Sequence, residues 1–175
     1  MHYIIRLGIL ILLFSMMQSC ERDEIVDGMR PIYLQEKDLL KVKSTEPAAF
    51  ENLGKIVAKD NYLFINEKFK GIHVIDNTDP ANPVKKFFWE IRGNREFTIV
   101  HNVLYAESWK LLLVIDISDY GNIQLLSAIK DQYVPERVEI YPEGYSGYFE
   151  CYDASAGGFG GWEKASIINP RCKTN

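Results

Sequence analysis

The sequence predicts an all-β protein, and three observations support this fold class. Ten Tyr, nine Phe and three Trp among 175 residues bias the composition toward side chains that favour strands. Short apolar runs alternate with turn residues through the middle of the chain. The run at 111–119 repeats the run at 71–79, and both end in an Asp-x-x-Asp turn. The middle of the chain is therefore expected to contain a repeated β unit.

Residues 1–20 are predicted to be a signal peptide. Arg6 precedes an unbroken apolar run at 7–14, and small or polar residues then lead to Cys20. The run is shorter than the roughly 20 apolar residues that cross a bilayer, and a charged stretch follows at once. We therefore expect a targeting segment rather than the first helix of the folded domain.

A signal that ends in Ser-Cys resembles a bacterial lipoprotein signal, in which the cysteine becomes the lipidated first residue. The resemblance implies that Cys20 is the lipid attachment site and that the protein is anchored in the outer membrane, on its periplasmic face or at the cell surface. Met17 stands where Leu is usual, which is similar to lipoproteins of Bacteroidetes-like bacteria. The acidic residues after Cys20 are similar to their surface-export signal.

The remaining cysteines, Cys151 and Cys172, form an even pair once Cys20 carries lipid. In an oxidising envelope we expect them to form a disulfide. The alternative, two free thiols in a cytosolic protein, requires that residues 1–20 are not a signal. The net charge of −4 becomes −5 without residues 1–20, because Arg6 is their only Lys, Arg, Asp or Glu. This balance argues against nucleic acid as a partner.

Residues 21–50 are predicted to be a tether and N-terminal segment. The segment begins with polar residues, and 30–34 is expected to form a short edge strand with Pro31 near its start. Residues 36–43 favour a helical turn, and 44–47 are typical of a linker.

Residues 51–135 are predicted to hold two β repeats of four strands each. Asn61 aligns with Asn102 and Asp76 with Asp116, so the offset is 41 residues early in the repeat and 40 later. This period is typical of a blade of a β-propeller. The expected strands are 55–58, 62–66, 72–76 and 84–91 in the first repeat and 97–100, 103–107, 111–117 and 123–129 in the second.

The stretch from Asn61 to Pro83, with Gly71-Ile72-His73-Val74-Ile75-Asp76 at its centre, resembles the LVIVD repeat of bacterial and archaeal surface or envelope proteins. The resemblance covers about residues 52–132 and implies a propeller-like repeat rather than a particular activity. Closed propellers use four or more blades, so two repeats predict an incomplete propeller. The continuous apolar runs at 62–65 and 111–115 predict sheets that are covered on both faces. The N-terminal segment, the tail or a second copy of the chain is expected to cover the outer faces.

Residues 136–175 are predicted to form an aromatic, Gly-rich tail held by the disulfide. We expect a wrapped loop with strands at 137–141 and 145–151 and a helical turn at 162–165. Tyr145, Tyr148 and Trp162 are expected to cap the open sheet faces, or alternatively to stack on sugars or peptides.

The Asp-x-x-Asp turns are the candidate ligand or turn residues. Their carboxylates offer oxygen ligands to calcium, but they provide fewer donors at a wider spacing than calcium loops do. We expect them instead to accept hydrogen bonds from backbone N–H groups and to fix the turns. The residues concerned are Asp76, Asp79, Asp116 and Asp119.

Other motifs do not predict catalysis, so we expect no catalytic residue, no metal and no cofactor. His73 and His101 lack a partner at metal spacing, and the former is expected to be a structural histidine. The glycine run at 157–161 lacks the ending of a phosphate loop. Glu67 and Glu107 occupy similar places on the second strands and suit acid–base work on glycans, but we expect them to be solvated strand ends.

These observations favour a non-enzymatic, lipid-anchored envelope protein that acts as an interaction or scaffold module. Its partner is expected to be a protein or a glycan. The alternatives are an envelope enzyme that acts on glycans and a shortened repeat protein that functions only as a homo-oligomer.

Overall fold

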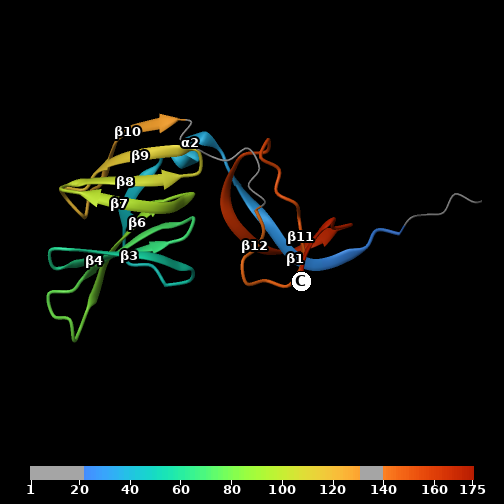
Figure 1. Ribbon diagram of the computed structural model, residues 1–175, viewed down its shortest axis with the longest axis horizontal. Helices are drawn as coiled ribbons and strands as arrows, with labels where there is room; N and C mark the ends of the chain where they lie inside the picture. The colour runs from blue at the N-terminus through green and yellow to red at the C-terminus, as the bar shows by residue number, and fades with distance from the viewer. Residues whose placement is uncertain (1–21, 131–139) are drawn as a thin grey trace, which may run out of the picture.

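The computed structural model describes residues 22–130 and 140–175, which form two lobes (Figure 1). One lobe consists of two β-sheets from the middle of the chain, and the other is a sheet that joins the beginning and the end of the described chain. The elements are β1 (Ile25–Leu34), α2 (Glu36–Leu39), β2 (Val42–Thr45), β3 (Leu53–Lys59), β4 (Tyr62–Glu67), β5 (Gly71–Asp76), β6 (Val84–Ile91), β7 (Asn94–Val100), β8 (Val103–Ser108), β9 (Leu111–Asp116), β10 (Gln124–Lys130), β11 (Gly147–Phe149), β12 (Gly158–Ile168) and β13 (Cys172–Thr174).

The two repeats form separate antiparallel sheets, which we call blade 1 and blade 2. Blade 1 has the strand order β2-β6-β5-β4-β3, and blade 2 has the order β10-β9-β8-β7. The β3–β4 and β7–β8 turns place Asp60 and His101 at the same φ of 53°, which confirms that the repeats share their geometry. The predicted all-β fold with two blade-like units of an incomplete propeller is thus confirmed. One correction concerns the predicted linker at 44–47, because its first two residues belong to β2, which adds a fifth strand to blade 1.

The core lies between the blades. Phe64 and Val74 of blade 1 pack with Leu104 and Leu113 of blade 2, and all four are fully buried. Trp89 is also fully buried and donates its indole N–H to the carbonyl oxygen of Tyr120 at 2.9 Å, which ties blade 1 to the β9–β10 loop. The inner faces of the two repeats therefore supply the apolar burial that holds this lobe together.

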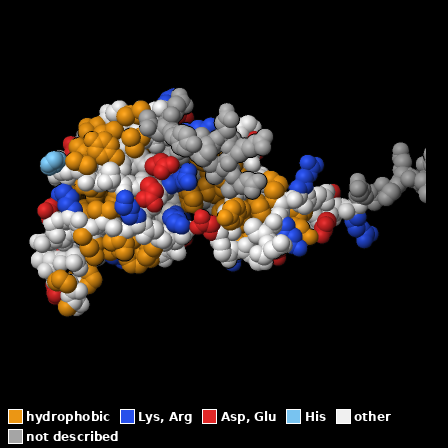
Figure 2. Space-filling model, in the orientation of Figure 1, with side chains coloured by type: hydrophobic (Ala, Val, Ile, Leu, Met, Phe, Trp, Pro, Cys, Tyr) orange, Lys and Arg blue, Asp and Glu red, His pale blue; other side chains and the backbone are white. Residues whose placement is uncertain are grey.

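The outer faces of the two blades are covered to different degrees. Residues 46–52 lie over the outer face of blade 1, where the Phe50 ring contacts the His73 ring at a centroid distance of 4.6 Å. On blade 2 the outward side chains of Tyr105 and Val114 remain half-exposed. Figure 2 shows hydrophobic side chains at the surface of this lobe. The expected cover by the N-terminal segment is therefore present on blade 1, whereas the described part of the tail, residues 140–175, does not cap a blade face.

The remaining strands form what we call the terminal sheet, with the order β12-β1-β11-β13. β1 pairs with β12 from Ile25 opposite Ile168 to Leu34 opposite Gly158. The predicted short edge strand at 30–34 is thus part of a longer internal strand. The expected wrapped loop and the helical turn at 162–165 are wrong, because these residues belong to β12. Of the helical turn predicted at 36–43, residues 36–39 form α2, whereas 42 and 43 belong to β2. The strand expected at 137–141 lies mostly outside the described residues.

The disulfide between Cys151 and Cys172 is confirmed, with a Cα–Cα distance of 5.4 Å. It lies beside the β11–β13 pair, where Phe149 is opposite Cys172. Cys20 lies outside the described residues. Within 22–130 and 140–175, no helix is both long and apolar enough to cross a membrane.

Candidate functional site

The ends of the blades that face the terminal sheet carry an aromatic residue at equivalent repeat positions. Phe69 lies in the β4–β5 turn and Trp109 in the β8–β9 turn, with left-handed φ values of 66° and 55°. Non-glycine residues adopt this conformation at a cost of about 1–3 kcal/mol, and they do so where the surroundings enforce it. Gly93 donates its N–H to the carbonyl oxygen of Phe69 at 2.8 Å and accepts the N–H of Trp109 at 3.2 Å. The two turns are thus held together through one residue.

A buried pair of amides fixes the junction between the blades behind these turns. Asn94 donates its side-chain N–H to Asn66 Oδ1 at 2.6 Å, and Asn66 donates to the carbonyl oxygen of Arg95 at 2.6 Å. Both asparagines are fully buried. The sequence offers a signal for Asn66, a polar residue near the end of an apolar strand, but none for Asn94, the first residue of β7. It also does not show which carbonyl group the Asn66 amide bonds. The result is that Arg95 is held in a defined place beside the turns.

Aromatic contacts join the blades to the terminal sheet. The Phe69 ring meets Phe159 at 4.9 Å, and the Trp109 ring meets Tyr152 at 5.5 Å, both edge to face. Phe159 in turn contacts Trp162 at 5.4 Å. Such pairs contribute about 0.5–1.5 kcal/mol each beyond the area that they bury. The equivalent turn residues of the two repeats therefore position the second lobe.

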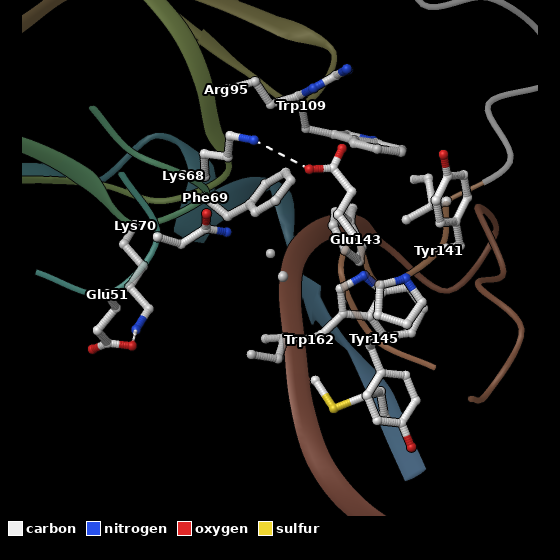
Figure 3. Close-up of a pocket in the computed structure, with 18 residues that line it drawn as sticks. Glu51, Lys68, Phe69, Lys70, Arg95, Trp109, Tyr141, Glu143, Tyr145 and Trp162 are labelled. Atoms are coloured by element: carbon white, nitrogen blue, oxygen red, sulfur yellow. Dashed lines mark hydrogen bonds and ion pairs between the residues drawn. The ribbon is translucent and has the colours of Figure 1, made fainter. Parts of the chain in front are cut away.

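A cleft with a volume of about 450 Å³ lies between the lobes (Figure 3). Blade 1, blade 2, β12 and the segment 140–145 all contribute to its walls. Its aromatic lining consists of Phe69, Trp109, Tyr141, Tyr145, Phe159 and Trp162. Of the three tail residues singled out in the sequence, Tyr145 and Trp162 line the cleft. Tyr148 does not, and its ring lies under Lys173 Nζ at 5.0 Å.

The charged residues of the cleft form ion pairs. Lys68 reaches across the cleft to Glu143 at 3.3 Å (Figure 3), and Lys70 pairs with Glu51 at 2.5 Å. Arg95 pairs with Glu107 at 3.6 Å. All these side chains are at least partly exposed, so each pair contributes only about 0–1 kcal/mol to stability. Their charges nearly cancel, and the cleft presents donors and acceptors side by side.

Glu67 lies behind one edge of the cleft and bonds the backbone of that edge. Its side chain is 1% exposed and accepts the N–H groups of Glu51, at 3.0 Å, and of Asn52, both of which line the cleft. His73 Nε2 lies 3.0 Å from the same carboxylate, while His73 Nδ1 is buried without a partner. Burial alone raises the pKa of Glu67, but the hydrogen bonds of His73 and of the two backbone N–H groups outweigh it and lower that pKa.

The two glutamates at the ends of the second strands thus differ, and the expectation that both are solvated is wrong for Glu67. Glu67 is buried on the outer face of blade 1 under residues 46–52. Glu107 is 38% exposed on the outer face of blade 2. The structure does not bring these carboxylates together. His73, expected to be a satisfied structural histidine, has one ring nitrogen bonded to Glu67, but its Nδ1 has no partner among the described residues.

The Asp-x-x-Asp turns lie at the opposite end of the blades from the cleft, because β5 and β9 run away from it. Asp76 accepts the N–H of Thr78 at 3.0 Å and Asp116 that of Ser118 at 2.8 Å. Asp79 and Asp119 accept the N–H groups of Ala81 and Gly121.

These side chains fix the turns. Side-chain and backbone hydrogen bonds of Thr78 lower the pKa of Asp76, and those of Ser118 lower the pKa of Asp116. In the part of the chain that the structure describes, no three His, Cys, Asp or Glu side chains are grouped to hold a metal ion.

Both blades match the model of one known family. Residues 53–89 and 102–130 match the family model of the LVIVD repeat, and they correspond to β3–β6 and β8–β10. No curated protein and no solved structure matches the chain. The two blades of this protein are therefore similar to the LVIVD repeat, as their resemblance in sequence indicates.

Proposed function

We propose that the protein is a lipid-anchored, non-enzymatic module of the bacterial cell envelope, and that it binds a protein or glycan partner in the cleft between its lobes. The observation that carries the proposal is the cleft itself. A concave site of several hundred Å³, with aromatic walls and a few placed polar groups, is typical of ligand binding. The LVIVD repeats fit a scaffold that presents such a site on rigid sheets.

The arrangement of carboxylates favours binding over glycan hydrolysis. A glycosidase needs two carboxylates that flank one bond of its substrate. Glu67 and Glu107 lie on the outer faces of different blades, and the glutamates of the cleft are each paired with a lysine. The cleft lies at the junction of both repeats and the terminal sheet. This position also suits a module that recognises a partner without changing it.

The lipid anchor predicts that Cys20→Ala releases the protein from the membrane. In a Gram-negative host grown with radiolabelled palmitate, the wild-type chain should carry label and sediment with membranes. The Cys20→Ala chain should be unlabelled and soluble, because no acyl chains remain to bury in the bilayer. A chain with Cys151→Ala and Cys172→Ala should keep its label. Label that persists without Cys20 would contradict the anchor.

The cleft predicts that a bulky group at Glu143 abolishes binding. In a full-length chain with Cys20→Ser, Glu143→Cys provides a single free thiol for a large maleimide. Retention of biotinylated envelope extract on the immobilised protein should then fall at least about tenfold, the equivalent of one lost contact of about 1.4 kcal/mol. Ala81→Cys, in the exposed turn at the far end of blade 1, is the matched control and should bind as before. Equal binding after both modifications would exclude the cleft as the site.

A further inference from the structure

We infer that the ligand of the cleft is a neutral saccharide, whose ring stacks on Trp162 and Tyr141 and whose hydroxyl groups bond the ion-paired side chains of the rim. This inference rests on the proposed function and names the class of ligand for the same site. Three features of the cleft support it: two of its aromatic rings are exposed to a ligand, its charged side chains form ion pairs, and Glu67 holds the backbone of the edge that carries Glu51 and Asn52.

Two aromatic rings of the cleft are open to a ligand, and packing holds one of them, that of Trp162, in place. Trp162 is fixed by edge-to-face contacts with Phe149 at 5.5 Å and Phe159 at 5.4 Å, and it remains half-buried. Tyr141, on the other side, is 54% exposed. The C–H groups on one face of a sugar ring are weakly positive and complement the negative face of a π-system. A fixed ring also loses little entropy when it binds.

The polar groups of the cleft are both donors and acceptors. Lys68 beside Glu143, and Lys70 beside Glu51, each place an ammonium next to a carboxylate. A hydroxyl group donates one hydrogen bond and accepts up to two, so neighbouring hydroxyls of a sugar match such a pair. Within the described part of the chain, the indole N–H of Trp162 has no acceptor and is a further donor.

The charge balance selects a neutral ligand over an anionic one. Phosphate or carboxylate groups would be attracted by Lys68, Lys70 and Arg95 but would meet the carboxylates of Glu51 and Glu143 at the same rim. Displacing either glutamate would break an existing pair. A neutral polyol bonds the pairs as they stand, so its binding leaves the charges of the rim compensated.

The edge that carries Glu51 and Asn52 is preorganised by Glu67, which accepts both backbone N–H groups. The backbone of Asn52 is thereby held in the lining of the cleft, where its side-chain amide offers one acceptor and two donors. Trp162 and the edge that carries Glu51 and Asn52 are thus held in place by packing and hydrogen bonds, as a specific site requires.

The test uses the full-length chain with Cys20→Ser and an array of neutral oligosaccharides of hexoses and N-acetylhexosamines, with uronic-acid oligomers and soluble peptides on the same array. Binding to at least one neutral oligosaccharide is expected, with a change in indole fluorescence. Replacing both Tyr141 and Trp162 by Ala should weaken it about tenfold or more, and Tyr141→Ala alone about threefold. Tyr148→Ala, an aromatic residue of the same lobe outside the cleft, should change it less than twofold.

Trp162→Phe separates stacking from folding, since a ring remains against Phe149 and Phe159. It should weaken binding less than Trp162→Ala and leave the unfolding midpoint unchanged. Absence of binding to every neutral oligosaccharide, or equal losses in Tyr141→Ala and Tyr148→Ala, would overturn the inference. The envelope extract provides a second test. If its binding in the cleft persists after periodate treatment, which destroys sugars, and is lost after protease treatment, the inference is overturned but the proposed function stands. If the extract binds equally well after the cleft is blocked by the maleimide at Glu143→Cys, the proposed function itself is refuted.

Discussion

Replacing Glu67 by alanine is expected to lower the free energy of unfolding by about 3–5 kcal/mol, because it leaves three hydrogen-bond donors without their acceptor at about 1–3 kcal/mol each. Glu67 is 1% exposed and accepts three hydrogen bonds, from His73 and from the N–H groups of Glu51 and Asn52. Without it, His73 is buried with neither ring nitrogen bonded, because Nδ1 already lacks a partner. Urea denaturation of the full-length chain measures the loss.

The repeat supplies a matched control for this substitution. Glu107 occupies the equivalent place in blade 2, but it is 38% exposed and paired only with Arg95 at 3.6 Å. Glu107→Ala should therefore cost less than about 1 kcal/mol. Similar losses in the two variants would mean that the burial of Glu67 does not matter for stability.

The same carboxylate gives the protein a dependence on pH. Its folded-state pKa is lowered from the ordinary value of 4.5, because the hydrogen bonds from His73, Glu51 and Asn52 outweigh the effect of burial. A lowered pKa means that the stabilisation is present above pH 4.5 and is lost as the pH falls through the folded-state value. The difference in unfolding free energy between the wild type and Glu67→Gln should therefore shrink below pH 4.5. Asp76 and Asp116 also have lowered pKa values, but they are present in both chains and cancel.

The strands of the repeats follow from local sequence. The strand predicted at 84–91 has the observed bounds of β6, because Pro83 precedes it and the turn at Gly93 follows. Turn residues bound the other seven predicted strands of the repeats in the same way. The position of Phe69 and Trp109 is also readable from the repeat, since each occupies the same place in its own unit. The local pattern does not show which residues these two rings contact, namely Phe159 and Tyr152.

The terminal sheet escapes prediction because its partners are far apart in the chain. Ile25 pairs with Ile168, and no local signal joins them. The glycine run that looks like a flexible loop begins β12, where small residues are needed. A Cβ at Gly160 would lie 2.7 Å from Leu34 Cγ. The cleft depends on this sheet, so Trp162 is recognisable in the sequence as an aromatic residue of the tail but not as part of a site.

The burial of Glu67 is missed for a related reason. A carboxylate at the end of a strand is usually solvated, and the strand itself gives no sign of what lies over it. Residues 46–52, which the sequence marks only in part as a linker, return across blade 1 and bring Phe50 onto His73. This connecting segment therefore covers a sheet face and also forms one wall of the cleft.

Removing the disulfide by Cys151→Ser and Cys172→Ser is expected to destabilise the chain by about 3 kcal/mol, because it frees a loop with a sequence separation of 21 residues. That loop contains the whole of β12 and with it Phe159 and Trp162 of the cleft. Among the described strands, β13 pairs only with β11, through three residue pairs, so it depends most on the disulfide. Urea denaturation measures the loss, and wild-type protein under reductant should behave like the variant.

Hydrogen exchange localises the effect, because the disulfide lies in the terminal sheet and the blades have a core of their own. Amides of β11, β12 and β13 should exchange faster in the variant, whereas those of β5 and β9 should exchange as in the wild type. Loosening of β12 should also weaken binding in the cleft, since the ring of Trp162 is then no longer preorganised. An unchanged unfolding midpoint, or faster exchange spread evenly over both blades, would show that the cross-link does not hold the terminal sheet.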